Sequence, residues 1–242
     1  MNRALATAHR VGAQIFHDPR SLALVLVLPS LLLWLFKYVF DANPEMFHRV
    51  GPQMLGLFPF IIMFLLTSVT MVRERTSGTL ERLLSTRLRR GEFIAGYALA
   101  FGTAGLVQAA VTSAVGIWLL GLDVATPWIL GVFAVANALL GTGLGLLASA
   151  FARTEFQAVQ FMPLVVIPQL LLCGLLTPRD TMATVLTRIS DVLPLSYSAD
   201  SFTRLTQSGG WNGDFAVDLT MVLAFALASV ALAALTLRRR TA

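Results

Sequence analysis

The sequence predicts an all-α integral membrane protein in which six transmembrane helices form a single domain over residues 1–242. Two observations favour this fold. Of the 242 residues, 56% are hydrophobic and only 13% are charged, whereas soluble domains carry roughly 25% charged residues. The chain also contains six separate stretches that match the length a helix needs to cross the hydrocarbon core, about 20 mainly apolar residues.

The apolar stretches and the charges between them predict a topology. We expect transmembrane helices at residues 21–40, 52–71, 93–120, 129–151, 159–176 and 215–237. Arginines gather in the segments on the side of the two termini, and acids outnumber basic residues on the opposite side. Because cytoplasmic loops carry the excess of Lys and Arg, we expect a multi-pass protein of the cytoplasmic (inner) membrane with both termini in the cytoplasm.

The basic character indicates contact with lipid. The pI is near 10.3, and cytoplasmic arginines of a membrane protein face anionic lipid headgroups. We therefore expect membrane lipids, and no nucleic acid, as partners of these charges.

Residues 1–18 are predicted to form an amphipathic helix at the membrane interface, with a plain juxtamembrane linker as the alternative. Asp18 and Pro19 would end this helix before the first span. Its polar face would carry Arg3, Thr7, Arg10, Gln14 and His17, and its apolar face Leu5, Ala8, Val11, Gly12, Ile15 and Phe16.

The loop after the second span, RERTSGTLERLLSTRLRRGE at residues 73–92, is too charged to enter lipid. Beyond Gly78, leucines recur at helical spacing with arginines and Glu81 between them, which predicts a short amphipathic helix against the inner face of the membrane. Two interpretations remain open from the residues alone. The loop is either a solvated segment that sets topology or a docking element for a cytoplasmic partner.

Three segments resemble ABC-2-type transporter permeases. RERTSGTLERLL followed by GEFIAGY resembles that family's E-R-x-x-G-T-L-E-x-L-L motif and the x-E-x-x-x-G-K that follows it. HDPRSLALVLVLP resembles its entry into the first span, and LLCGLLTPRD with ISDVLPLSYSADSFTRL resembles its segment after the fifth. The three matches fall in the family's order and, with the six spans, cover nearly the whole chain. Tyr97 departs from the pattern, because the family often has lysine there.

The resemblance implies one half of an exporter. Two such permeases, identical or paired with a sister subunit, would form the pathway, and two separate ATP-binding subunits would bind ATP and Mg and drive it from the cytoplasm. Drug or antibiotic efflux is the expected activity, with a hydrophobic or amphipathic substrate, and export of lipid or lipid-linked glycan is the alternative. The implied ATPase-coupling helix involves Arg73, Glu74, Arg75, Gly78, Thr79, Leu80, Glu81, Arg82, Leu83 and Leu84.

The sequence argues against an ATPase site on this chain. A phosphate-binding P-loop needs a lysine after a glycine-rich turn, and the only lysine, Lys37, follows no such turn. The single cysteine, Cys173, excludes a cysteine zinc site. We therefore expect no catalytic residue, cofactor or metal here.

An ion-coupled secondary transporter is the alternative from another class of protein. Such transporters place ionisable groups inside the membrane, but the second to fifth predicted spans contain no Asp, Glu, Lys, Arg or His. Polar residues within the spans could line a substrate path or form interhelical hydrogen bonds. These candidates are Thr67, Ser68, Gln108, Asn137, Gln160 and Gln169.

The glycines of the fourth predicted span favour close helix packing, because Gly141 and Gly145 satisfy the small-xxx-small rule. The outer segment 177–214 is long for a connection, and apolar residues at helical spacing predict two short helices, the second beginning near Ser196. The family resemblance implies an extracellular gate in this segment. Its candidate residues are Pro178, Pro194, Tyr197, Asp200 and Arg204.

Overall fold

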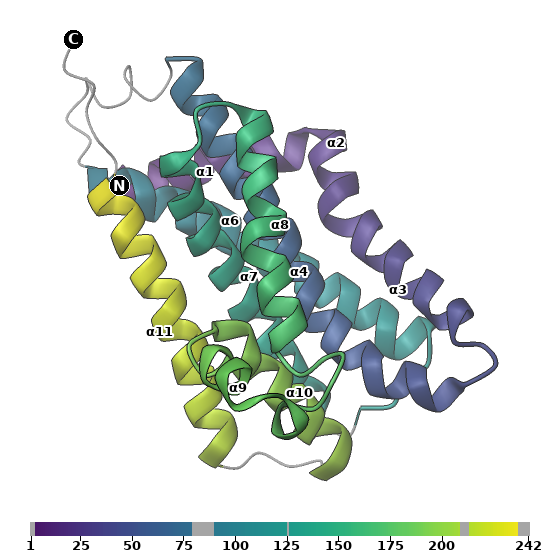
Figure 1. Cartoon of the computed structure of the whole chain (residues 1–242). Coiled ribbons are helices and arrows are strands. Elements are labelled where there is room, and N and C mark those ends of the chain that lie inside the picture. The colour runs from purple at the N-terminus through teal and green to yellow at the C-terminus, as the bar shows by residue number, and fades with distance from the viewer. Residues whose placement is uncertain (1–2, 79–89, 125, 209–212, 237–242) are drawn as a thin grey trace.

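The regular structure of the protein is helical throughout residues 3–78, 90–124, 126–208 and 213–236, which are the residues that the computed structural model describes. Within these ranges, five helices are long and apolar enough to cross a membrane, and a further apolar helix at Ala23–Val39 is shorter. The protein is therefore a multi-pass membrane protein. Figure 1 shows the long helices as a bundle, with α1 at one end and α9 and α10 at the other.

The chain begins with α1 (Arg3–His17), which is followed by α2 (Pro19–Leu22), a π-helical turn η1 (Ala23–Val27) and α3 (Leu28–Val39). The wide turn has a local cause. Pro29 has no N–H to donate to the carbonyl of Val25, and its ring crowds that turn, so the helix widens just before the proline. These elements occupy the predicted first span 21–40, and the widened turn splits it.

The long helix α4 (Pro44–Thr76) extends beyond the predicted span 52–71 at both ends. At its start, the side chain of Asn43 accepts a hydrogen bond from the backbone N–H of Met46, and Pro44 occupies the first turn, where it needs no partner for the missing N–H. Hydropathy identifies the apolar part of a helix, but it does not identify the residues at which the helix begins and ends. The polar turns outside lipid were therefore missed.

The other long helices are α6 (Arg90–Ala114) with a π-helical turn η2 (Val115–Leu119), α7 (Pro127–Phe151), α8 (Glu155–Leu172) and α11 (Gly213–Thr236). They occupy the predicted spans 93–120, 129–151, 159–176 and 215–237 with shifted ends. The prediction 159–176 is wrong at its end, because the chain leaves the helix after Leu172 and Gly174 adopts a φ of 94°. A left-handed residue of this kind does not continue a helix.

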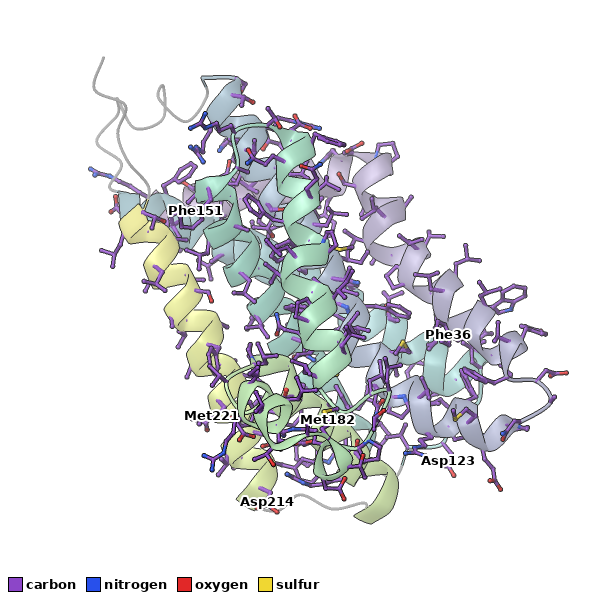
Figure 2. All side chains as sticks on the ribbon, in the orientation of Figure 1. Phe36, Asp123, Phe151, Met182, Asp214 and Met221 are labelled. Atoms are coloured by element: carbon purple, nitrogen blue, oxygen red, sulfur yellow. The ribbon has the colours of Figure 1, made fainter. Side chains whose placement is uncertain are left out.

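The segment between α8 and α11 contains a 3₁₀ turn η3 (Arg179–Thr181), α9 (Thr184–Ser190) and α10 (Pro194–Ser208). The two predicted short helices thus fall where the structure has helices. Figure 2 shows Asp123 and Asp214 near this end of the bundle and Phe151, the last residue of α7, near the opposite end. The ends of the long helices therefore separate into two faces, one beside α1 and one beside α9 and α10.

The centre of the fold is the contact between α4 and α7, which glycines permit. A Cβ atom added to Gly141 would lie 2.2 Å from the carbonyl oxygen of Phe60, and one added to Gly145 would lie 2.6 Å from that of Phe64. On another face of α7, a Cβ at Gly143 would lie 2.7 Å from the carbonyl oxygen of Ala226 in α11. The expected small-residue packing is confirmed, and α7 holds α4 and α11 at backbone contact.

We predict that Gly141→Ala destabilises the protein by about 1–3 kcal/mol, because its methyl group must displace the backbone of α4. The apparent melting temperature in detergent measures this effect. Gly131→Ala, on the same helix, is the matched control, since no heavy atom lies within 4 Å of a Cβ added there. Equal melting temperatures for the two variants would contradict the close packing of α4 and α7.

Candidate functional site

The last turns of α4 carry three consecutive charged residues, Arg73, Glu74 and Arg75, and each one contacts a different helix. Arg73 donates from Nε to Oε1 of Glu155 and from Nη2 to Oε2, both at 2.9 Å, in the parallel geometry that suits a guanidinium and a carboxylate. Glu155 is the first residue of α8. The ion pair therefore ties the end of α4 to the beginning of α8.

Arg75 contacts α7. Its Nη1 donates to the carbonyl oxygen of Ser149 at 2.5 Å. Ser149 belongs to the last turn of α7, where carbonyl groups lack intrahelical partners and carry the negative end of the helix dipole. The cation thus satisfies a carbonyl that the helix itself leaves open.

Glu74 contacts α1. Its Oε1 accepts from Nη1 of Arg10 at 3.2 Å, while Nη2 of the same arginine donates to the hydroxyl of Tyr97 in α6, also at 3.2 Å. The side chain of Glu74 is only 10% exposed and that of Arg10 is 32% exposed, and Tyr97 is fully buried. One partly buried cluster therefore joins α1, α4 and α6, and the residue that departs from the family pattern, Tyr97, belongs to it.

The predicted N-terminal helix is present as α1, and it packs against α6. A Cβ at Gly96 of α6 would lie 2.6 Å from Cβ of Thr7 and 2.8 Å from the carbonyl oxygen of Ala4, so the two helices meet at this glycine. Thr7, which was assigned to the polar face, is consequently buried, whereas Leu5 of the predicted apolar face is 55% exposed. Contact with α6 therefore decides which side of α1 is covered within the chain, and the position of α1 at the membrane interface stays a prediction.

Arg73, Glu74 and Arg75 thus form the base of the predicted coupling segment, and Gly78 is where α4 has ended. Gly78 has a φ of 73°, one residue beyond the helix cap Ser77. The other predicted coupling residues lie outside the described part of the chain, so the amphipathic coupling helix stays a prediction. These residues are Thr79, Leu80, Glu81, Arg82, Leu83 and Leu84.

The six predicted path residues differ in burial. Gln160 is exposed on α8, whereas the other five are buried. Ser68 donates to the carbonyl of Leu65, and Gln169 donates to that of Val165, each within its own helix. The candidates that the structure buries are Thr67, Ser68, Gln108, Asn137 and Gln169.

Asn137 borders a small cavity between α4, α7, α8 and α10. Its Oδ1 accepts from the hydroxyl of Ser198 at 2.6 Å, and Gln53 of α4 also lines the cavity. Gln53 and Ser198 were not among the predicted path residues. Gln53 could have been found, because it is a polar residue within the second predicted span. Ser198 could not, because no pattern in the sequence indicates that α10 packs against α7.

Two charged clusters lie at the α9–α10 end of the bundle, and Arg179 is the centre of the first. Arg179 donates to the carboxylates of both Asp191 and Asp200. Burial raises the pKa of Asp200 above its ordinary value, and the guanidinium of Arg179 opposes that shift. The cluster holds η3, α9 and α10 together.

A second pair fastens α10 to α11. Arg204 donates to Oδ2 of Asp218 at 2.8 Å, and Ser201 donates to the same oxygen at 2.7 Å.

The predicted gate residues have different positions. Pro194 is buried at the start of α10 and Pro178 is exposed, while the hydroxyl of Tyr197 donates to the carbonyl of Asp191 at 2.7 Å. Asp200 and Arg204 belong to the two charged clusters, but their partners Arg179 and Asp218 were not predicted. Across the described ranges, no group of three or more His, Cys, Asp or Glu side chains is placed to hold a metal ion.

Comparison with known proteins identifies similar sequences. The sequence profile of the ABC-2 type transporter family matches residues 4–205. YbhS of Escherichia coli (strain K12), described as a probable multidrug ABC transporter permease, is 26% identical over 206 residues, which are 84% of this chain and 55% of that protein. The linearmycin resistance permease protein LnrN of Bacillus subtilis is 28% identical over 172 residues, 69% of this chain and 45% of that protein.

A eukaryotic relative matches less of its own length. ABC transporter G family member 20 of Dictyostelium discoideum is 26% identical over 172 residues, which are 70% of this chain and 23% of that protein. The chain thus spans about half the length of the bacterial relatives and less of this one.

We predict that Glu74→Gln lowers stability by about 1–3 kcal/mol, because it leaves the half-buried Arg10 without its charged partner. Glu155→Gln is the matched control. The side chain of Glu155 is 43% exposed, and pairs of this kind contribute under about 1 kcal/mol. Melting temperatures in detergent measure both effects, and a larger loss for Glu155→Gln would contradict the assigned importance of the cluster at Arg10.

We predict that Arg179→Gln loosens the segment between α8 and α10, because Asp191 and Asp200 lose their shared guanidinium. Amide hydrogen exchange over residues 173–191 should accelerate about tenfold. Arg188→Gln, which removes an exposed charge of α9, is expected to leave exchange unchanged. The same acceleration in both variants would show that net charge, and not the bonds of Arg179, controls this segment.

Proposed function

Because this chain belongs to the ABC-2 type transporter family, we propose that it is the permease subunit of an ATP-driven exporter and that ATP is hydrolysed on separate subunits. Two ATP-binding subunits carry ATP and Mg, and two permeases, identical or sisters, form the pathway. The similarity to two permeases, which covers about half of their length, supports this assignment for the shared part. The activity of the whole assembly is part of the proposal.

The observation that carries this proposal is the set of contacts made by Arg73, Glu74 and Arg75. They begin the family-like motif RERTSGTLERLL, whose remaining residues continue into the segment 79–89. Through them, a displacement of that segment acts on α8, α1 and α7 at once. A docking element needs such a base, because a loop attached to a single helix would bend without moving the pathway.

The proposed topology has six spans and both termini in the cytoplasm. The first of these spans, which adds to the five long apolar helices, is the continuous helical stretch 19–39 formed by α2, η1 and α3. Lys37 near its end donates from Nζ to the carbonyl of Leu120 at 2.8 Å, so its charge is satisfied where the helix leaves lipid. The beginning of α1 and the end of α11 lie at the same end of the bundle, which supports an even number of crossings (Figure 1).

The proposed substrate is a hydrophobic or amphipathic compound of the drug or antibiotic type. The names of two relatives support this class, since one is described as a multidrug permease and the other as a linearmycin resistance permease. Coupling to an ion gradient is less consistent with the site. Asp218, the acid within α11, already accepts from Arg204 and Ser201, so its carboxylate is committed to fixed partners.

We predict that Glu81→Arg or Arg82→Glu abolishes co-purification of a co-expressed ATP-binding subunit, because each reverses a charge in the docking segment. Pull-down of a tagged ATP-binding subunit and ATPase activity of the reconstituted complex measure the effect. Asp180→Arg is the matched control, since it reverses an exposed charge at the opposite end of the protein. Normal assembly of both docking variants, or transport by the chain alone under an ion gradient, would refute the proposed function.

A further inference from the structure

Pro59 divides α4 into two parts that are held differently. We call residues 44–58 the first part and residues 60–76 the second part. The second part is fixed by backbone contact, because the glycines of α7 lie against its carbonyl groups. The first part meets side chains instead: a Cβ added to Gly56 would lie 2.0 Å from Cε2 of Phe202 in α10. Since a side chain can change its rotamer where a helix backbone does not yield, the first part has more freedom to move.

The proline also removes a hydrogen bond at the boundary between the two parts. Pro59 has no N–H to donate to the carbonyl of Leu55, four residues earlier in the helix. At spacings of four residues, Leu55, Pro59 and Met63 share one face of α4. A Cβ added to Gly105 of α6 would lie 3.2 Å from Cγ of Met63. One added to Gly116 of η2 would lie 3.3 Å from Cδ1 of Leu55. The helix formed by α6 and η2 therefore passes over the interrupted turn.

Two polar side chains of α6 lie at this turn without a hydrogen bond. Gln108 and Thr112 come between Gly105 and Gly116 at spacings of three and four residues, so they share the face toward α4. Both are fully buried, and within the described part of the chain neither amide atom of Gln108 nor the hydroxyl of Thr112 has a partner. Buried polar groups are costly to leave unpaired. The carbonyl that Pro59 frees is an acceptor in the same interface.

The opposite face of the first part borders the small cavity near Asn137. Gln53 and Leu57 line this cavity from α4, and Cys173 lines it from the end of α8. Leu57 is two residues from the proline and therefore lies about 160° from it around the helix. A movement of the first part toward α6 would bring the free carbonyl toward the unpaired amide and draw α4 away from the cavity. It would also break the hydrogen bond of 3.1 Å from Nε2 of Gln53 to Thr203 of α10.

We propose that the first part of α4 pivots about Pro59 between two positions, one against α10, as in this structure, and one against α6. In the second position Gln108 donates to the carbonyl of Leu55, and this bond replaces the one that Gln53 makes in the first. Because one hydrogen bond is exchanged for another, the two positions are close in free energy. The second part keeps its contact with α7, so the charged residues at its end keep their partners.

For the proposed exporter, the pivot means that the end of the bundle beside α10 opens while the docking end is unchanged. The pivot itself is a property of this chain and requires no ATP-binding subunit. Its test is therefore separate from that of the proposed function.

The test uses Cys173 as a reporter in the full chain, purified in detergent. This residue is the only cysteine of the sequence and is 3% exposed, so N-ethylmaleimide reaches its thiol when the cavity opens. Pro59→Ala restores the missing N–H, which gives the carbonyl of Leu55 a donor within the helix and removes the advantage of the second position. We expect about fivefold slower modification in this variant, the factor that one net hydrogen bond contributes. Mass spectrometry measures the rate, well below the melting temperature.

Pro52→Ala is the matched control. It restores an N–H in the same helix, but Pro52 precedes both cavity residues of α4, so a pivot there would not move them. Its rate of modification should equal that of the unsubstituted protein.

A second pair of variants keeps the test decisive if Pro59→Ala folds poorly. Gln108→Leu removes the amide that is paired only in the second position, so it should also slow modification about fivefold. Thr103→Val, which removes an exposed hydroxyl bonded within α6, should not. An unchanged rate in Pro59→Ala or in Gln108→Leu would overturn the proposal. Equal slowing by Pro52→Ala and Pro59→Ala would overturn it too, by showing that the stiffness of α4 as a whole controls access to the thiol.

Discussion

The fold depends on the backbone contact between α4 and α7. Helices in lipid gain little from hydrophobic burial, so their association requires close packing and hydrogen bonds. Gly141 and Gly145 bring the carbonyl groups of Phe60 and Phe64 to within van der Waals contact of α7, and Gly143 does the same for α11. Since one helix sets the height and rotation of two others, it also sets which partners the charged residues at the ends of those helices can reach.

The charged triplet at the end of α4 follows from that packing. Arg75 comes eleven residues after Phe64, about three helical turns, so it lies on the same face of α4 and reaches Ser149, one turn beyond Gly145 on α7. Glu74 and Arg73 are each rotated by about a further 100° around the helix. They therefore point away from α7, toward α1 and α8. The three neighbouring side chains reach three different helices, because the glycine contact fixes the rotation of α4.

The sequence predicted the membrane class, the apolar helices and the glycine packing, because these depend on composition and on spacing within one helix. It did not predict the partners of Tyr97 and Asp218, since those contacts join residues far apart in the chain. Tyr97 accepts its hydrogen bond from Arg10, which lies 87 residues earlier in the chain. This pairing depends on how α1 crosses α6 at Gly96. Gln53 and Ser198 were missed for the same reason: α4 and α10 meet α7 around Asn137 only in three dimensions.

The contacts of Arg73, Glu74 and Arg75 also constrain how the length of α4 can change, both in engineered variants and among relatives. Inserting or deleting one residue in α4 after Phe64 would turn the triplet by about 100° and present each charge to its neighbour's partner. Substitutions there remove one contact, whereas a change of length misdirects all three. Chimaeras that exchange docking segments between permeases should therefore be joined beyond Gly78, where the left-handed residue has already ended the register of the helix.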